Sequence, residues 1–278
     1  MAIDTIIRRA VGARRHHFPS GDDVPLFTAD WRGAVFAHFA IEPAHLQPSI
    51  PFELDTRAGH AYVSLVAFTQ SNLRPSIGGP VAAWLITPLA SHEFLNLRTY
   101  VRVGGLRGIY FVAEWIPNRL AVLLGPRTYG LPYRLGRLRY EVDKPRGLLR
   151  GQVRTNGDKA FKYEADFSAE AARFASAPDG SLDQFLLERY VAFTRCHGVS
   201  RRFLVDHAPW PQQRVDLNLI EHSILDFGGA WSRHARFVGG EFLRGRHRRH
   251  DQRAANARRP GGAACAKRRA GARFPLRA

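Results

Sequence analysis

One segment in the first half of the chain alternates so regularly that it constrains the fold more than any other. Between Phe94 and Val103, one set of alternate positions is mostly apolar and the other set is mostly polar; the first is Leu95, Leu97, Thr99, Val101 and Val103, and the second is Asn96, Arg98, Tyr100 and Arg102. A period of two residues is the pattern of a β-strand with two different faces. Gly104-Gly105 and Gly108 then lead into segment 109–115, so the pattern predicts a β-hairpin.

Strand-like segments recur along most of the chain. We expect strands at 26–40, 61–68, 120–124, 138–142, 147–155, 160–167, 202–206 and 214–220. Asn156-Gly157 marks a tight hairpin turn, and segment 71–80 has the composition of a loop. Two helices are predicted, a short one in 42–51 and a longer one that Ser181 caps and whose apolar stripe reaches Phe193. Many short strands with few helices predict an α+β fold with a strongly curved, barrel-like, mostly antiparallel sheet.

Composition divides the chain into three parts. The net charge is +17, but the last 38 residues hold 12 Lys/Arg and 2 Asp/Glu. We therefore expect a polar N-terminal arm at 1–24, a single domain at 25–240 and a basic, disordered tail at 241–278. The two cysteines, Cys196 and Cys265, lie far apart, which favours a reducing compartment. No apolar run reaches the roughly 20 residues of a membrane-spanning helix, so a cytoplasmic protein is expected.

The stretch 125–136 is the candidate functional segment. It contains three glycines, two prolines, two arginines and two tyrosines in twelve residues. Glycine reaches backbone angles that other residues avoid, and proline fixes its own. A chain that leaves a buried strand through such a stretch can present Arg127, Tyr129, Tyr133 and Arg134 at the edge of a cavity.

This stretch resembles a turn of the acetoacetate decarboxylase-like proteins, in which a Pro-Lys-Lys-Leu-Gly run follows Gly-Arg-Glu. Pro132, Leu135 and Gly136 match that pattern. The position of the Schiff-base lysine is Tyr133, and its neighbouring lysine is Arg134. The acidic residue of the pattern is replaced by Arg127.

A closer resemblance is to the YqjF-like family of uncharacterised proteins, which belongs to the same fold superfamily. The matching segments are 27–32, 96–101, 108–111, 130–133, 188–190 and 207–210. Each is short, but their order and spacing over residues 27 to 210 are specific. The resemblance implies an antiparallel sheet that encloses a cavity.

The lysines argue against Schiff-base catalysis, which needs a neutral amine in a buried or cationic setting. The chain has four lysines. Lys144 and Lys159 lie in turns, Lys267 lies in the tail, and Lys162 shares a strand face with Glu164, so it should face water. We expect the decarboxylation that the resemblance implies to be absent.

A cavity wall of arginines and phenols remains. Arg127 is expected to hold a carboxylate or phosphate, with Arg98, Arg134 and Tyr100 as further ligand contacts. Tyr133 is the one catalytic candidate, as a proton donor or an orienting donor. The alternative is structural: the arginines pair with carboxylates, Tyr133 packs in the core, and Arg98 lies on a solvated strand face.

The histidine spacings do not indicate a metal site, and no cofactor motif is present. His207, which precedes Pro209-Trp210, is expected to pack in a bend.

Three hypotheses for function stay open at this level. The first is binding of a small anionic or carbonyl-containing molecule in a central cavity. The second is a non-catalytic interaction protein whose basic tail contacts nucleic acid or anionic surfaces, and the third is an enzyme with a pocket around Glu114 or His92. The residues leave open whether the chain is an enzyme and whether it forms a homo-oligomer.

Overall fold

The computed structural model describes residues 27–243 except 76–77, 129, 169, 171–172, 197 and 206. In this part of the chain, thirteen strands form one sheet. The strands are β1 (Phe27–Ile41), β2 (Glu53–Leu54), β3 (Ala61–Pro75), β4 (His92–Val103), β5 (Leu106–Ile116), β6 (Tyr133–Asp143), β7 (Leu148–Thr155), β8 (Ala160–Asp166), β9 (Val191–Cys196), β10 (Val199–Leu204), β11 (Gln212–Val215), β12 (Leu217–Glu221) and β13 (Arg236–Leu243). The helices are short: α2 (Pro43–Leu46), α3 (Gly79–Leu85), α4 (Arg119–Thr128) and α5 (Leu182–Leu187), with 3₁₀ turns at Gln47–Ser49, Thr87–Leu89, Ser223–Gly228 and Ala230–His234.

The hydrogen-bonded order of the sheet is β11-β13-β1-β3-β4-β5-β6-β7-β8-β12. Neighbouring strands pair antiparallel except at β5, which pairs parallel with β6 and with β9. The sheet therefore branches at β5: one branch continues through β6, and the other consists of β9 and its partner β10. A mostly antiparallel sheet with few helices is therefore confirmed. The barrel is not confirmed, because β11 and β12 end the order without pairing to each other among the described residues.

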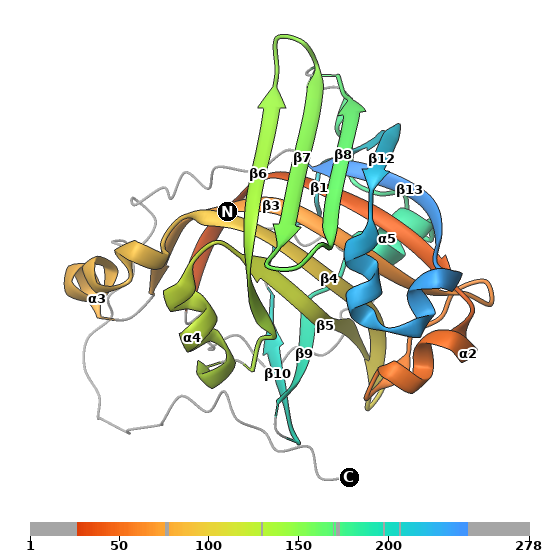
Figure 1. The fold of residues 1–278 in the computed structure, drawn as a ribbon, viewed down its shortest axis with the longest axis horizontal. Helices are drawn as coiled ribbons and strands as arrows, with labels where there is room; N and C mark the ends of the chain where they lie inside the picture. Colours follow the sequence, from red (N-terminus) through yellow and green to blue (C-terminus); the bar gives the residue numbers. More distant parts are fainter. Residues whose placement is uncertain are drawn as a thin grey trace, which may run out of the picture.

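The main core lies between two parts of this sheet. In Figure 1 the long strands β1, β3, β4 and β5 form one layer, and the green strands β6, β7 and β8 stand across it. Alternate residues of the first layer, such as Val35, Leu65 and Leu97, share one buried cluster with Val153 and Phe161 of β7 and β8. The other face of the long strands is covered by different segments and carries the candidate site.

Several predicted elements are confirmed. The hairpin of β4 and β5, the meander of β6 to β8 and the short helix after Glu42 all form. Lys162 is exposed, while Phe161 and Tyr163 on the opposite strand face are buried. The predicted strands at 202–206 and 214–220 form with shifted bounds, as β10 and as the pair β11 and β12.

The prediction of a buried strand at 120–124 is wrong, because this segment begins α4. The side-chain oxygen of Asn118 accepts hydrogen bonds from the backbone N–H groups of Leu120 and Ala121, at 2.9 and 3.1 Å, and so caps the helix. Leu120, Leu123 and Leu124 are exposed. A run of five apolar residues fits either a strand or one helical turn, and the cap decides between them.

The long helix predicted after Ser181 is wrong beyond Leu187. Ser181 does cap α5, since its hydroxyl accepts from the N–H of Gln184 at 3.1 Å. The helix ends where the side chain of Arg189 turns back and donates to the carbonyl of Phe185. Segment 191–196 is instead strand β9, in agreement with its β-branched and aromatic residues. The loop expected at 71–80 is also shorter than predicted, because β3 continues to Pro75 beside β1.

The domain boundary at 240 needs correction. Glu241, Phe242 and Leu243 belong to β13, pair with β1 and β11, and are buried. The sheet therefore includes the first three residues that composition assigned to the tail. The arm 1–24 and residues 244–278 lie outside the described residues. Among the helices that are described, none is long and apolar enough to cross a membrane.

Candidate functional site

A band of buried polar side chains crosses the second face of the long strands. We call it the polar band; each member is at most 4% exposed, and the members are His38, Ser64, Asn96, Arg98, Glu114 and Glu241. It separates two apolar clusters, one around Phe36 and Phe68 and the other around Tyr100 and Phe185. Burying charged groups is costly unless they are paired. Polar groups held between apolar clusters therefore need a structural or functional reason.

Sheet register brings the band together. Ser64 of β3 lies opposite His38 of β1 on one side and opposite Arg98 of β4 on the other. Asn96 lies opposite Glu114 of β5, which in turn lies opposite Tyr133 of β6. All of these positions fall on one face because side chains along a strand alternate between faces.

One half of the polar band is a connected chain of contacts. Nε2 of His38 lies 2.6 Å from a carboxylate oxygen of Glu241. Nδ1 of the same ring lies 2.6 Å from the hydroxyl of Ser64, which lies 2.6 Å from the hydroxyl of Tyr100. These four side chains form one buried network.

The other half of the band has unused hydrogen-bonding capacity. Among the described residues, twelve buried side-chain atoms have no hydrogen-bond partner, and three of them lie together here: Oδ1 of Asn96, Nε of Arg98 and Oε2 of Glu114. Two more belong to the first half, since Nε2 of His38 and Oε2 of Glu241 are in close contact but too poorly aligned for a hydrogen bond. Nη2 of Arg98 donates to the carbonyl of Leu186 at 3.1 Å. The guanidinium of Arg98 also lies over the ring of Phe36, 4.9 Å from its centroid. Buried polar atoms without a partner are uncommon, so these three mark a place for a missing partner.

Glu114 differs from an ordinary surface carboxylate. Burial raises its pKa to about 8. A carboxyl group with such a pKa is protonated at neutral pH and can donate a hydrogen bond or a proton. Glu114 therefore adds a donor beside Asn96, which fits the hypothesis of a pocket around Glu114.

The turn that the sequence singled out lies beside Glu114, where the sheet branches. One edge of β5 pairs with β9 at Ile109 and Tyr110 and with β6 from Glu114 onwards. The turn 130–132 fills the interval, and the N–H of Glu114 donates to the carbonyl of Pro132 at 3.1 Å. Gly130 has a φ of +69°, and a side chain there would also collide with the guanidinium of Arg201.

Three of the predicted site residues, Arg98, Tyr100 and Tyr133, lie at the polar band, and Arg134 does not. Arg98 and Tyr100 are buried at the band, so the structural alternative in which Arg98 lies on a solvated strand face is wrong. The second face of β4 is covered by α5 and the turn 130–132. Tyr133 is half-buried and packs between the two apolar clusters, with its ring edge-on to Phe94. Arg134 lies in register with Trp115 on the opposite face, and its guanidinium rests on Phe227.

Two predicted site residues lie outside the described part. Tyr129 is not described, and Arg127 belongs to the backbone of α4, but its side chain is outside the description. Their roles stay predictions.

The sequence reasoning missed His38, Ser64, Asn96 and Glu241 as site residues. A signal was available for two of them, since His38 and Ser64 interrupt otherwise apolar strand positions. Glu241 carried none, because it stands at the start of the basic segment.

Two other polar features, Asp55 and His207, have structural explanations, and a third, His92, does not. Asp55 is fully buried and pairs with Arg102, Arg107 and Arg189 at 2.7 to 3.0 Å. Burial alone would raise the pKa of Asp55, but hydrogen bonds from these arginines outweigh it and hold the pKa below its usual value. His207 stacks between Tyr190 and Trp210, as expected of a residue that packs in a bend. His92 is buried against Phe94, burial lowers its pKa, and neither of its ring nitrogens has a partner among the described residues, so the packing does not explain it and a pocket around His92 stays a hypothesis.

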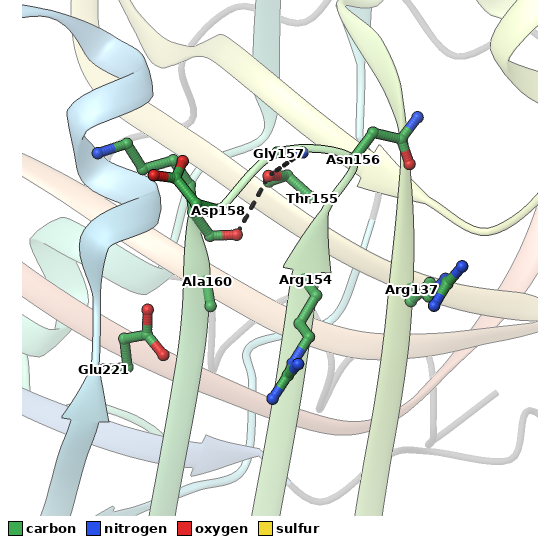
Figure 2. A pocket seen from close by; sticks show the side chains of 9 residues that line it. Arg137, Arg154, Thr155, Asn156, Gly157, Asp158, Ala160 and Glu221 are labelled. Carbon is green, nitrogen blue, oxygen red and sulfur yellow. Dashed lines mark hydrogen bonds between the residues drawn. The ribbon is translucent and has the colours of Figure 1, made fainter.

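A surface groove of about 520 Å³ surrounds the turn between β7 and β8 (Figure 2). Its wall carries both charges, with Arg137, Arg154 and Lys159 against Asp158 and Glu221. The groove contains none of the predicted site residues. The described residues also contain no group of three or more His, Cys, Asp or Glu side chains that could hold a metal ion.

The fold is that of the acetoacetate decarboxylase-like proteins. An acetoacetate decarboxylase-like enzyme from Sphingomonas wittichii RW1 superposes with a TM-score of 0.55, at 15% identity over 84% of this chain and 94% of that chain. The acetoacetate decarboxylase from Legionella pneumophila has a TM-score of 0.51, at 13% identity over 83% and 89%. The enduracididine biosynthesis enzyme MppR, complexed with pyruvate, has a TM-score of 0.51, at 16% identity over 82% and 92%. At these identities the similarity establishes the fold alone.

The family is established separately. Residues 28–235 match the DUF2071 family, described as an uncharacterized conserved protein. The uncharacterized protein YqjF of Bacillus subtilis (strain 168) is 31% identical over 213 residues, which cover 75% of this chain and 84% of the relative. The chain belongs to the DUF2071 family, and the resemblance drawn from its short motifs is confirmed.

Proposed function

We propose that the protein binds a small organic anion or carbonyl compound at the polar band, without forming an imine. The observation that carries the proposal is the group of three partnerless buried atoms, on Asn96, Arg98 and Glu114. Together they supply a carbonyl acceptor, a cationic N–H donor and an acid that is neutral at pH 7. A carboxylate or ketone oxygen would satisfy the two donors.

The lysines support chemistry without an imine. Lys144 and Lys162 are exposed, and Lys159 pairs with Asp226 at 3.0 Å on the surface. None of these three reaches the polar band. Tyr133, at the position of the Schiff-base lysine in the related pattern, keeps its proposed role as an orienting or proton-donating group at the edge of the band.

Ligand entry requires a movement of the cover. Arg98 is held by the carbonyl of Leu186 in α5, and Leu131 of the turn packs beside the same cluster. Helix α5 has only six residues. We propose that α5 and the turn 130–132 separate to admit the ligand.

The test uses the full chain and four probes: pyruvate, acetoacetate, acetate and phosphate. Binding is measured by ligand-observed NMR and calorimetry. At least one organic probe should bind, and Arg98→Met should weaken it about 10- to 100-fold, the loss expected for a hydrogen bond to a charged group. Arg139→Met, an exposed arginine of β6, is the matched control and should change nothing.

Two results would contradict the proposal. The first is that no probe binds, or that both variants bind equally well. The second is a covalent adduct on a lysine of residues 27–243 after sodium borohydride treatment with pyruvate or acetoacetate, which would demonstrate the imine that the proposal excludes.

A further inference from the structure

The network of Glu241, His38, Ser64 and Tyr100 belongs to the same region as the partnerless atoms of Asn96, Arg98 and Glu114, but the binding proposal gives it no chemical task. Its members come from β13, β1, β3 and β4, and they are 1%, 1%, 0% and 1% exposed. Four strands thus place a carboxylate, an imidazole and two hydroxyls in sequence, with 2.6 Å at every step. Such an arrangement can move a proton as well as stabilise the fold.

The direction of the hydrogen bonds follows from the carboxylate at one end. A ring nitrogen and a carboxylate oxygen 2.6 Å apart need a hydrogen between them, so Nε2 of His38 carries the hydrogen although the contact is poorly aligned for a hydrogen bond. Nδ1 is then left as an acceptor. The hydroxyl of Ser64 must then donate to Nδ1, so its oxygen accepts from the hydroxyl of Tyr100. The hydrogens of the network therefore all point from Tyr100 toward Glu241.

Arginine side chains lie near both ends of the network, at Glu241 and at Tyr100. Arg214 lies 3.8 Å from the other carboxylate oxygen of Glu241 and 3.3 Å from Asp183, the second acid near this end. At the Tyr100 end, the guanidinium groups of Arg98 and Arg189 lie 5.8 and 5.1 Å from the centre of the phenol ring. Positive charges therefore lie near both ends of the network.

We infer that Tyr100 is a proton-transfer residue for the ligand of the polar band. Ser64, His38 and Glu241 form the relay that accepts the hydroxyl proton of Tyr100 and returns it. The inference rests on the proposed function and adds a reaction class, the removal of a proton from carbon next to a carbonyl. The hydroxyl proton of Tyr100 passes to Ser64 while the proton of Ser64 passes to Nδ1 of His38. The resulting phenolate takes the C–H proton of the ligand, and the electron pair of that bond forms an enolate whose oxygen Arg98 stabilises. Reversal of the steps returns a proton, or a deuteron in D₂O.

The first arm of the test needs no ligand. NMR of the full chain with ¹⁵N-labelled histidine, with His38→Gln to assign the signals, should show hydrogen on Nε2 of His38 and none on Nδ1. Hydrogen on Nδ1 would reverse the order of bonds and overturn the inference.

The second arm follows deuterium exchange into the methyl group of pyruvate in D₂O by ¹H NMR. The protein should accelerate exchange, and Tyr100→Phe and Ser64→Ala should lower the rate at saturating pyruvate about 10²-fold or more. The matched controls are Tyr163→Phe, a buried tyrosine in the main core, and Ser71→Ala, a buried serine of the same strand β3; both should keep the wild-type rate.

The outcomes separate the two proposals. If pyruvate binds but exchange is not accelerated, or if both relay variants exchange at the wild-type rate, the relay is refuted and the binding proposal stands. If pyruvate does not bind, the proposed substrate class is wrong, and the histidine tautomer still decides the direction of the relay.

Discussion

Glu241 places a carboxylate oxygen 2.6 Å from Nε2 of His38, although the two residues stand at opposite ends of the described chain. Strands β13 and β1 pair antiparallel with a register shift between His38 and Phe39, and Glu241 lies opposite Phe36. The contact therefore depends on the last strand completing the sheet beside the first. A residue that composition assigned to a basic tail thus contributes the acid of a buried network.

Removal of the hydroxyl of Ser64 should destabilise the fold measurably. Ser64→Ala leaves Nδ1 of His38 and the hydroxyl of Tyr100 buried and unpaired, and each lost partner costs about 1–3 kcal/mol. Urea unfolding should therefore report a loss of about 2–5 kcal/mol. Ser71→Ala should cost less than about 1 kcal/mol, because Ser71 has no partner to lose among the described residues. Equal stability of the two variants would show that the network is not formed in solution.

As pH rises from 5 to 8, the free energy of unfolding should decrease because of Glu114. Its folded-state pKa of about 8 exceeds its ordinary value of 4.5, so the folded protein holds a proton that the unfolded chain releases in this range. Each pH unit then costs up to about 1.4 kcal/mol of unfolding free energy, and the loss ends once pH exceeds about 8. Urea unfolding at several pH values measures the slope.

Glu114→Gln should remove this slope, because an amide does not titrate. Glu141→Gln, on an exposed position of β6, should keep it. A slope that survives in Glu114→Gln would mean that Glu114 is ionised in the folded protein, and its role as a neutral donor would be lost.

Much of the sheet could be predicted because its signals are local. The alternation in β4 and the glycines after it define the hairpin with β5, and Asn156-Gly157 defines the turn between β7 and β8. Segment 120–124 could not be assigned correctly because the deciding interaction, the cap from Asn118, is a side-chain contact that an apolar run does not reveal. The end of α5 could not be placed because Arg189 is drawn to Asp55, which is distant in sequence.

The candidate site could be predicted only in part. The motifs identify Arg98, Tyr100 and Tyr133, and the sequence offers Glu114 as an alternative. The polar face of β4 resembles a solvated surface, because alternation gives the two faces of a strand but not what covers the second one. Helix α5 and the turn 130–132 cover it, and no local pattern indicates that packing.

Asp55 should be a major determinant of stability. Asp55→Asn leaves the buried guanidinium of Arg189 without its carboxylate, and breaking a buried pair costs about 3–5 kcal/mol. Since the pKa of Asp55 lies below its unfolded value, the stabilisation is present at neutral pH and should fade only as pH drops below about 4. Urea unfolding at pH 7 measures the loss. Asp158→Asn, on the exposed β7–β8 turn, is the control, and a similar small effect for both would contradict the role of the pair.

Gly125 should be required for the position of Tyr133. A Cβ atom at residue 125 would lie 2.1 Å from the ring of Tyr133, so Gly125→Ala must displace the ring or α4. We expect a loss of about 1–3 kcal/mol in thermal or urea unfolding, the usual cost of overpacking. A Cβ atom at residue 157 would meet only the hydroxyl oxygen of Thr155, at an ordinary contact distance of 3.7 Å, so Gly157→Ala should be nearly neutral. If Gly125→Ala is neutral as well, Tyr133 does not pack as described.

Locating the ligand tests binding at the polar band most directly. The ¹⁵N signal of Nε of Arg98, assigned by its loss in Arg98→Met, is followed while pyruvate or acetoacetate is added to the full chain. We predict that this signal shifts in a saturable way together with the backbone N–H signals of Asn96 and Glu114. Shifts confined to the groove around residues 154–160, with the Arg98 signal unchanged at saturation, would contradict ligand binding at the polar band.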